Sequence, residues 1–168
     1  MTFYDEFRGN ALAAYNQGVA KLKLKSGGEL GLSIDGLIVR QLRPEDLGSS
    51  YPWWELNQTS TNTWTKFTGA TTYTIADNRF CLVNGVYFNG DSGTLHQVRI
   101  TRQQSTTRYW VVSPIRGFKS KTGWTDDPWT VDQNTVITIE GICSSVSTLT
   151  DFDFVGAVAE KRGLLINP

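Results

Sequence analysis

Short runs of apolar and polar residues, separated by turn residues, make up most of this 168-residue chain. Residues 80–83 are apolar at every position, which is typical of a strand buried on both faces. Residues 96–101 alternate polar and apolar side chains, which predicts a strand with one face in water. Residues 108–112 are aromatic and β-branched, which also favours a strand. Asn89 and Gly90 predict a tight hairpin turn between the first two strands.

Further strands are predicted where other short apolar and β-branched runs occur, at residues 36–40, 71–75, 135–142 and 152–158. Residues 21–25 alternate lysine with leucine, Ser26-Gly27-Gly28 suits a turn, and residues 29–34 alternate with the same period. This pattern predicts a β-hairpin with its leucines facing inward. Residues 43–48 contain Pro44 and suit a turn or one helical turn. Two polar and aromatic segments predict loops with short strand pieces, at residues 48–69 and 114–129.

The N-terminal segment has a different pattern from the rest of the chain. Its apolar residues recur at i, i+4 spacing, and residues 11–14 favour a helix. Gly9 and Gly18 interrupt this pattern, so we expect residues 1–20 to form a short helix or an ordered arm. Residues 21–168 then form a single β domain.

Many short strands, little helix and long aromatic loops together predict an all-β fold, either a jelly roll or a β-sandwich, with a short N-terminal arm or helix. A smaller β-barrel is the alternative. The length is sufficient for a hydrophobic core without disulfides or metals.

Charge and hydropathy narrow the choice of partners. Lys and Arg total 16 and Asp and Glu also total 16, and this balance argues against a general nucleic-acid binder. No apolar run is long enough to span a membrane, and the N-terminus has no apolar segment of a secretory signal. Two cysteines, Cys81 and Cys143, lie in predicted buried strands. A disulfide between sheets would fit them, but without a secretion signal we expect two free thiols in the core.

Residues 90–93 read Gly-Asp-Ser-Gly and resemble the nucleophile segment of trypsin-like serine proteases. That chemistry needs a histidine base and a buried aspartate upstream of the serine, whereas the single histidine, His96, lies downstream. A hairpin turn accounts for the same four residues. His96 shares the phase of the apolar residues of its strand, so we expect it to pack and to form hydrogen bonds. One histidine and two distant cysteines do not suffice for a zinc site.

Two acid pairs are the remaining candidates for chemistry, Asp126 with Asp127 and Asp151 with Asp153. The first pair could hold calcium or serve a glycosidase, but the further oxygen ligands of a calcium loop are not evident. Solvated acids in turns explain both pairs. The sequence also has no glycine-rich phosphate-binding motif. We therefore expect no enzymatic activity, no metal and no cofactor.

Five of the six tryptophans lie in the two predicted loop regions, and the sixth, Trp110, lies in a predicted strand. They could pin the loops to the sandwich, contact another subunit or form platforms for sugars, and we favour these roles in that order. The residues expected at an interface are aromatic and come from the N-terminal arm and the loops: Phe3, Tyr4, Phe7, Trp53, Trp54, Trp124 and Trp129.

This chain combines loops rich in Thr, Asn and Gly with an aromatic N-terminal arm, balanced charge and the lack of an active site. In these respects it resembles small β-rich virion proteins of tailed bacteriophages, such as capsid cement proteins, head fibres and tail-fibre tips. The resemblance implies a non-enzymatic protein of the virion, assembled in the host cytoplasm. It implies a homo-oligomer, with a trimer favoured, that binds the major capsid protein or another virion protein. A carbohydrate-binding module or receptor-binding fibre tip is the alternative.

Overall fold

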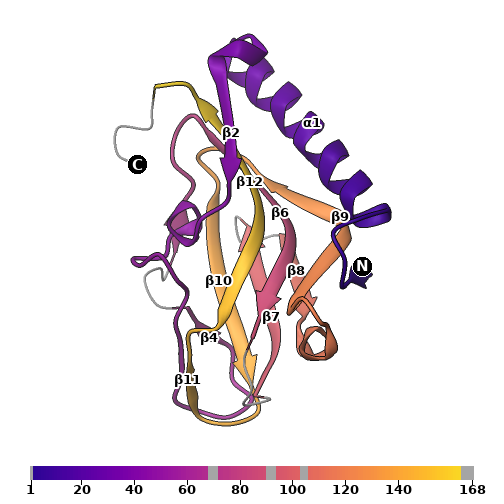
Figure 1. Cartoon of the computed structure of the whole chain (residues 1–168). Coiled ribbons are helices and arrows are strands. Elements are labelled where there is room, and N and C mark those ends of the chain that lie inside the picture. Colours follow the sequence, from indigo (N-terminus) through magenta and orange to yellow (C-terminus); the bar gives the residue numbers. More distant parts are fainter. Residues whose placement is uncertain (1, 68–71, 90–93, 103–105, 164–168) are drawn as a thin grey trace.

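Two antiparallel sheets pack face to face in the computed structural model, which describes residues 2–67, 72–89, 94–102 and 106–163 (Figure 1). The first sheet has the strand order β1 (Phe3–Tyr4), β9 (Thr122–Val131), β6 (Arg79–Phe88), β12 (Phe152–Lys161) and β2 (Leu37–Gln41). The second has the order β4 (Thr65–Lys66), β10 (Val136–Cys143), β7 (Leu95–Arg102) and β8 (Thr106–Val111). Two further pairings are made by β5 (Tyr73–Thr74) with β10, and by β3 (Leu56–Gln58) with β11 (Ser147–Leu149).

This strand order is that of a jelly roll. The row β2-β12-β6-β9 of the first sheet faces the row β4-β10-β7-β8 of the second. Neighbours that are distant in sequence pair antiparallel, as β2 does with β12, β4 with β10 and β6 with β9. Only β7 and β8 are consecutive strands of one sheet among these eight. The predicted all-β jelly roll or sandwich is therefore confirmed, and two separate sheets form instead of the alternative barrel.

The main core lies between the sheets and contains most of the large buried side chains. β6 is buried along nearly its whole length, because its inner face meets the second sheet and its outer face meets a helix. This burial on both faces explains why the sequence of β6 is apolar without alternation. β7 and β10 instead alternate buried and more exposed residues, as expected for strands of a sheet with one face in water.

The helix α1 (Asn10–Leu30) covers the outer face of the first sheet (Figure 1). The residues that face the sheet are small, apart from one leucine: Ala11, Ala14, Gly18, Leu22 and Ser26. They let the helix approach closely, since a Cβ at Gly18 would lie 3.0 Å from a methyl carbon of Leu82. Leu22 packs with Phe80 and Leu82 of β6 in a second, smaller core.

The β-hairpin predicted for residues 21–34 is wrong, because most of this segment belongs to α1. The alternation of lysine and leucine suits a strand, but on the helix it places Leu22 against the sheet and leaves Leu24 72% exposed. Ser26, Gly27 and Gly28 do not turn the chain. The helix ends instead at Gly31, whose left-handed φ of 63° and N–H bonds to carbonyls of the last turn cap it.

The N-terminal segment before the helix packs on its own chain. β1 pairs with β9, with Phe3 opposite Thr125. The Asp5 carboxylate accepts hydrogen bonds from the backbone N–H groups of Lys119 and Ser120 at 2.8 and 2.9 Å and from the Ser120 hydroxyl. These bonds, first of all that from the Ser120 hydroxyl, lower the pKa of Asp5. The helix then runs across the predicted boundary between residues 20 and 21.

Two other sequence predictions are wrong for reasons of topology. The hairpin predicted between residues 80–83 and 96–101 does not form, because β6 and β7 lie in different sheets. Residues 90–93 themselves lie outside the described residues. The predicted loop at 114–129 contains the long strand β9, which the polar residues of this segment concealed. Opposite Asn84, β9 has an irregularity in register at residues 125–128, so its sequence lacks regular alternation.

The other predicted elements are confirmed. β2, β5, β10 and β12 lie where strands were expected, and Pro44–Leu47 forms a single turn of 3-10 helix. A closed group of four charged residues ties this turn to the first sheet. Arg40 binds Asp46 through two hydrogen bonds of 2.6 Å and Glu160 at 2.8 Å, and Arg79 reaches both acids at 3.2 and 3.0 Å. All four side chains are largely buried, so each charge depends on its partners.

Candidate interaction surface

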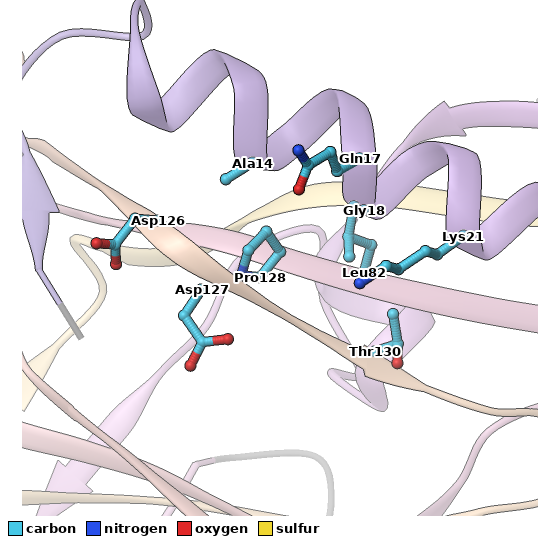
Figure 2. A pocket seen from close by; sticks show the side chains of 9 residues that line it. All are labelled: Ala14, Gln17, Gly18, Lys21, Leu82, Asp126, Asp127, Pro128 and Thr130. Carbon is cyan, nitrogen blue, oxygen red and sulfur yellow. The ribbon is translucent and has the colours of Figure 1, made fainter.

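The acid pair Asp126 and Asp127 lies beside a groove between α1 and β9 (Figure 2). The groove has a volume of about 260 Å³, and Gln17 and Lys21 of the helix are among its lining residues. Figure 2 shows the two carboxylates leaving the strand in different directions. Asp126 accepts a hydrogen bond from the backbone N–H of residue 2, and Asp127 binds Arg108 at 2.7 Å. The two acids therefore do not converge on one ligand or one reacting bond.

The second acid pair is also separated by its environment. Asp151 is exposed, whereas burial raises the pKa of Asp153 to about 6, and the negative charge of Glu45 adds to the rise. A carboxyl with such a pKa can act as a general acid or base near neutral pH. Such chemistry also needs a cleft and a second reacting group beside it. Asp153 is not a lining residue of the groove beside Asp126 and Asp127, nor of the hollows beside Phe7, Val111, Asn10 and Lys119.

Other chemistry-bearing residues have structural partners. His96 lies 3.3 Å from the Ser113 hydroxyl, in keeping with the expected packing and hydrogen-bonding role. Cys81 and Cys143 are buried free thiols, as predicted, and burial raises the pKa of both. No group of three His, Cys, Asp or Glu side chains able to hold a metal occurs among the described residues.

Two of the predicted interface residues belong to the core. Trp54 is 1% exposed and packs edge-on against Phe67 and Phe154. Trp129 is buried against Trp110, with ring centroids 5.8 Å apart. These tryptophans fill the sandwich, which is the first of the three roles considered for the aromatic loop residues, and they offer little surface to another chain.

The predicted interface residues of the N-terminal segment are partly accessible. Phe7 is 39% exposed, and its ring lies on Trp124 with centroids 4.2 Å apart and packs edge-on against Tyr15. Phe3 and Tyr4 are half-buried in β1. Phe7, Tyr15 and Trp124 line an apolar hollow of about 280 Å³ next to the outer face of the first sheet. Contact of these residues with another chain stays a prediction.

A second exposed aromatic group lies in the loop after the 3-10 turn at Pro44–Leu47. Tyr51 and Trp53 are 43% and 46% exposed, and their rings stack with centroids 5.1 Å apart and an angle of 7° between the planes. The Ser49 hydroxyl donates a 2.6 Å hydrogen bond to the carbonyl of Trp53 and holds this loop. The pair forms a flat aromatic surface. Of its two members, only Trp53 was predicted to lie at an interface.

The free edge of β8 forms a third exposed region, which the sequence analysis missed. Tyr109 and Val111 are 50% and 47% exposed. With Phe3, Pro114 and Phe118 they line an apolar hollow of about 400 Å³ between β1 and β8. The sequence placed these side chains in a strand, but it did not reveal that the strand lies at the edge of its sheet.

Tyr109 also belongs to a cluster on the outer face of the second sheet. The Arg99 guanidinium lies 4.2 Å from the ring centroid of Trp64, and Tyr109 packs edge-on against the same ring. Arg99 donates a 2.7 Å hydrogen bond to Glu140, and this bond raises the pKa of Arg99. Trp64, Arg99 and Tyr109 come from three different strands or loops, so neither spacing nor composition could have grouped them.

The three exposed regions are defined as the Phe7 hollow, the Tyr51–Trp53 stack and the β8 edge. Comparison of the sequence with protein-family models found no match, and comparison with curated proteins found none either. Among the described residues, no helix has the length and hydrophobicity needed to cross a membrane.

Proposed function

We propose that the protein is a non-enzymatic structural protein of a virus particle, of the capsid cement or decoration type. In this role it binds another virion protein, such as the major capsid protein, and stabilises the particle. It also associates with copies of itself. The expected location is the virion, assembled in the host cytoplasm.

The observation that supports this proposal is the placement of exposed apolar side chains on a jelly roll. The Phe7 hollow, the Tyr51–Trp53 stack and the β8 edge lie on different elements. Aromatic side chains are enriched where protein chains meet, and several such regions suit a subunit that contacts more than one neighbour. Jelly rolls are common in viral capsid proteins, which adds an argument by analogy of fold.

Virus particles provide the direct test. Particles purified from a host strain that carries the gene should contain the protein at a fixed ratio to the major capsid protein. Adding purified protein to particles that lack it should raise the temperature at which they release their nucleic acid. Absence of the protein from purified particles would refute the proposal.

Variants can show which region makes the attachment. Phe7→Ala and Trp53→Ala each remove an exposed aromatic side chain and should weaken particle binding. Leu24→Ala is the matched control, because Leu24 is an exposed apolar residue on the open side of α1. Equal loss of binding in the control would mean that general surface hydrophobicity, and not these regions, mediates the contact.

The Tyr51–Trp53 stack favours carbohydrate binding as a second candidate function. Its rings are nearly parallel and almost half exposed, so an apolar sugar face could lie on the outer ring. Jelly rolls also occur among lectin domains. This function would suit a carbohydrate-binding module or a receptor-binding fibre tip.

A polysaccharide array separates the two candidates. If the second holds, the protein should bind one class of glycan, and Trp53→Ala should abolish that binding while Phe7→Ala leaves it unchanged. Binding to particles that have been stripped of surface glycans would favour the capsid role.

A further inference from the structure

The strand β8 (Thr106–Val111) is the outermost strand of the second sheet, so one side of its backbone has no neighbouring strand in the described part of the chain. Val111 pairs with Gln97 of β7, and the N–H of Val112 donates to the carbonyl of His96. In an antiparallel pair, successive residues alternate between bonding their neighbour and pointing away from it. Thr107, Tyr109 and Val111 therefore direct their N–H and C=O groups away from β7.

These outward groups have no other hydrogen-bond partner among the described residues. The other edges differ from β8 in the described part of the chain. β1 and β4 have two residues each, which is too short for an extended ladder. β2 has five residues, but Leu37 is buried and Val39 packs against the helix layer. At the β8 edge, Tyr109 and Val111 are half exposed and no charged side chain occupies an outward position.

We propose that two copies of this chain pair through antiparallel β8 edges around a two-fold axis at Tyr109. This inference rests on the self-association included in the proposed function, and it specifies the surface and the symmetry. It gives a dimer as the unit of assembly, in place of the trimer expected from the sequence. The second sheets of the two copies join into one continuous sheet of ten strands, five from each copy.

Hydrogen-bond geometry selects the register. With Tyr109 opposite Tyr109 of the second copy, Thr107 lies opposite Val111, and all three outward residues of each copy are paired. A shift that pairs Thr107 with Tyr109 leaves Val111 without a partner in β8 of the second copy. The opposite shift, which pairs Tyr109 with Val111, leaves Thr107 unpaired. The register centred on Tyr109 thus satisfies the largest number of backbone groups.

The charge of Arg108 argues against one of the shifted registers. Arg108 then lies opposite Trp110 of the second copy, whereas the shift that pairs Thr107 with Tyr109 would place Arg108 directly opposite itself. Within one chain the Arg108 guanidinium already lies 5.8 Å from the Trp110 ring and binds Asp127. The chain has no net charge, so the copies do not repel each other at long range. The apolar hollow beside Val111 extends the contact beyond the backbone bonds.

Cysteine cross-linking tests the register in the full-length protein. Cα atoms of a hydrogen-bonded antiparallel pair lie about 5.5 Å apart, within the range of a disulfide. Tyr109→Cys should therefore form a covalent dimer under mild oxidation. Thr107→Cys alone should not, but a mixture of Thr107→Cys and Val111→Cys proteins should give the mixed dimer. The native protein is the control, since both of its cysteines are buried.

Mass measurement by sedimentation tests the dimer without cross-linking. The native protein and Tyr109→Phe should both be dimers. Tyr109→Lys places two like charges opposite each other and should weaken dimerisation by more than about tenfold, with an unchanged circular dichroism spectrum. A monomer or trimer for the native protein, or a Thr107→Cys protein that cross-links only with itself, would overturn the inference. Particle binding by such a trimer would leave the proposed function intact, and particle binding by a monomer would leave its capsid-binding part intact, so the two failures can be distinguished.

Discussion

The two sheets of this jelly roll are protected from water in different ways. The first sheet is covered on its outer face by α1, and its central strands β6 and β12 are buried over most of their length. The second sheet has an uncovered outer face, where Trp64, Arg99 and Tyr109 meet. Each sheet contains ion pairs, but those of the first are nearly enclosed.

Because of this difference, we assign stability of the fold to the first sheet and contact with other chains to the second sheet. A sheet that is apolar on both faces needs a cover within its own chain, because exposed apolar faces of this size would aggregate. The sheet with one polar face is stable in water as it stands and leaves its edge β8 available to a neighbour. We therefore expect changes at the first sheet to affect stability, and changes at the second sheet to affect association.

The largest difference in stability should appear between variants that break the ion pairs of the two sheets. Glu160→Gln removes one charge from the buried group with Arg40 and Arg79 and should lower the free energy of unfolding by about 4 kcal/mol. Glu140→Gln breaks a single pair with Arg99 on the outer face of the second sheet and should lower it by about 1 kcal/mol. Urea unfolding measures both. Equal losses would mean that the two sheets do not differ in this respect.

Removing part of the helix contact should have the next largest effect. Leu22→Ala leaves a cavity against Phe80 and Leu82 and should lower the free energy of unfolding by about 3 kcal/mol. Leu24→Ala is the control on the same helix, and it should change stability by less than about 0.5 kcal/mol since Leu24 is 72% exposed. Thermal unfolding of both variants measures the difference. Equal stability of the two variants would show that α1 is not part of the core.

The pH dependence of stability should come in part from the first sheet. The folded-state pKa of Asp153, about 6, lies above its ordinary value, so the unfolded chain releases this proton first as the pH rises. Its contribution therefore lowers stability between about pH 4 and pH 6, and the loss is complete above pH 6. Asp153→Asn should abolish this fall in stability and raise the free energy of unfolding by about 2 kcal/mol at pH 7.

Asp151→Asn is the control for the same strand end, because Asp151 is exposed. Urea unfolding at pH 4 and pH 7 should show a changed pH dependence in the Asp153 variant and an unchanged one in the Asp151 variant. The same pH dependence in Asp153→Asn and the native protein would contradict the assigned pKa.

The sequence predicted correctly those strands in which the pattern of apolar and polar residues agrees with the burial of the side chains. β7 and β10 alternate because one face is wet, and β6 is apolar because both faces are buried. It indicated a short helix within residues 1–20 but failed for the rest of α1, where lysine and leucine alternate along the helix while mostly small residues face the sheet. It also failed for β9, where the irregular register at residues 125–128 disrupts alternation. In both cases tertiary packing decided the structure.

The candidate surface was less predictable than the fold. Aromatic composition selected Phe7 and Trp53, whose rings are exposed, but it also selected Trp54 and Trp129, which are core residues. A sequence shows that a tryptophan lies in a loop, but not whether the loop folds over the sandwich. Tyr109 was missed because the edge position of β8 follows from sheet order, which depends on pairing between strands far apart in the chain.

The smallest effect is expected on the open face of the second sheet. Trp64→Ala removes the ring that lies under the Arg99 guanidinium and beside Tyr109. Cation–π contacts at exposed sites are worth about 0.5–1 kcal/mol, and Trp64 is only partly buried, so the loss of stability should be about 1 kcal/mol. Trp54→Ala is the contrast in the core and should cost at least about 3 kcal/mol. Urea unfolding of both variants at the same protein concentration makes the comparison. A loss above about 2 kcal/mol for Trp64→Ala would mean that the outer face of the second sheet is packed like a core, and the contrast between the sheets would then fail.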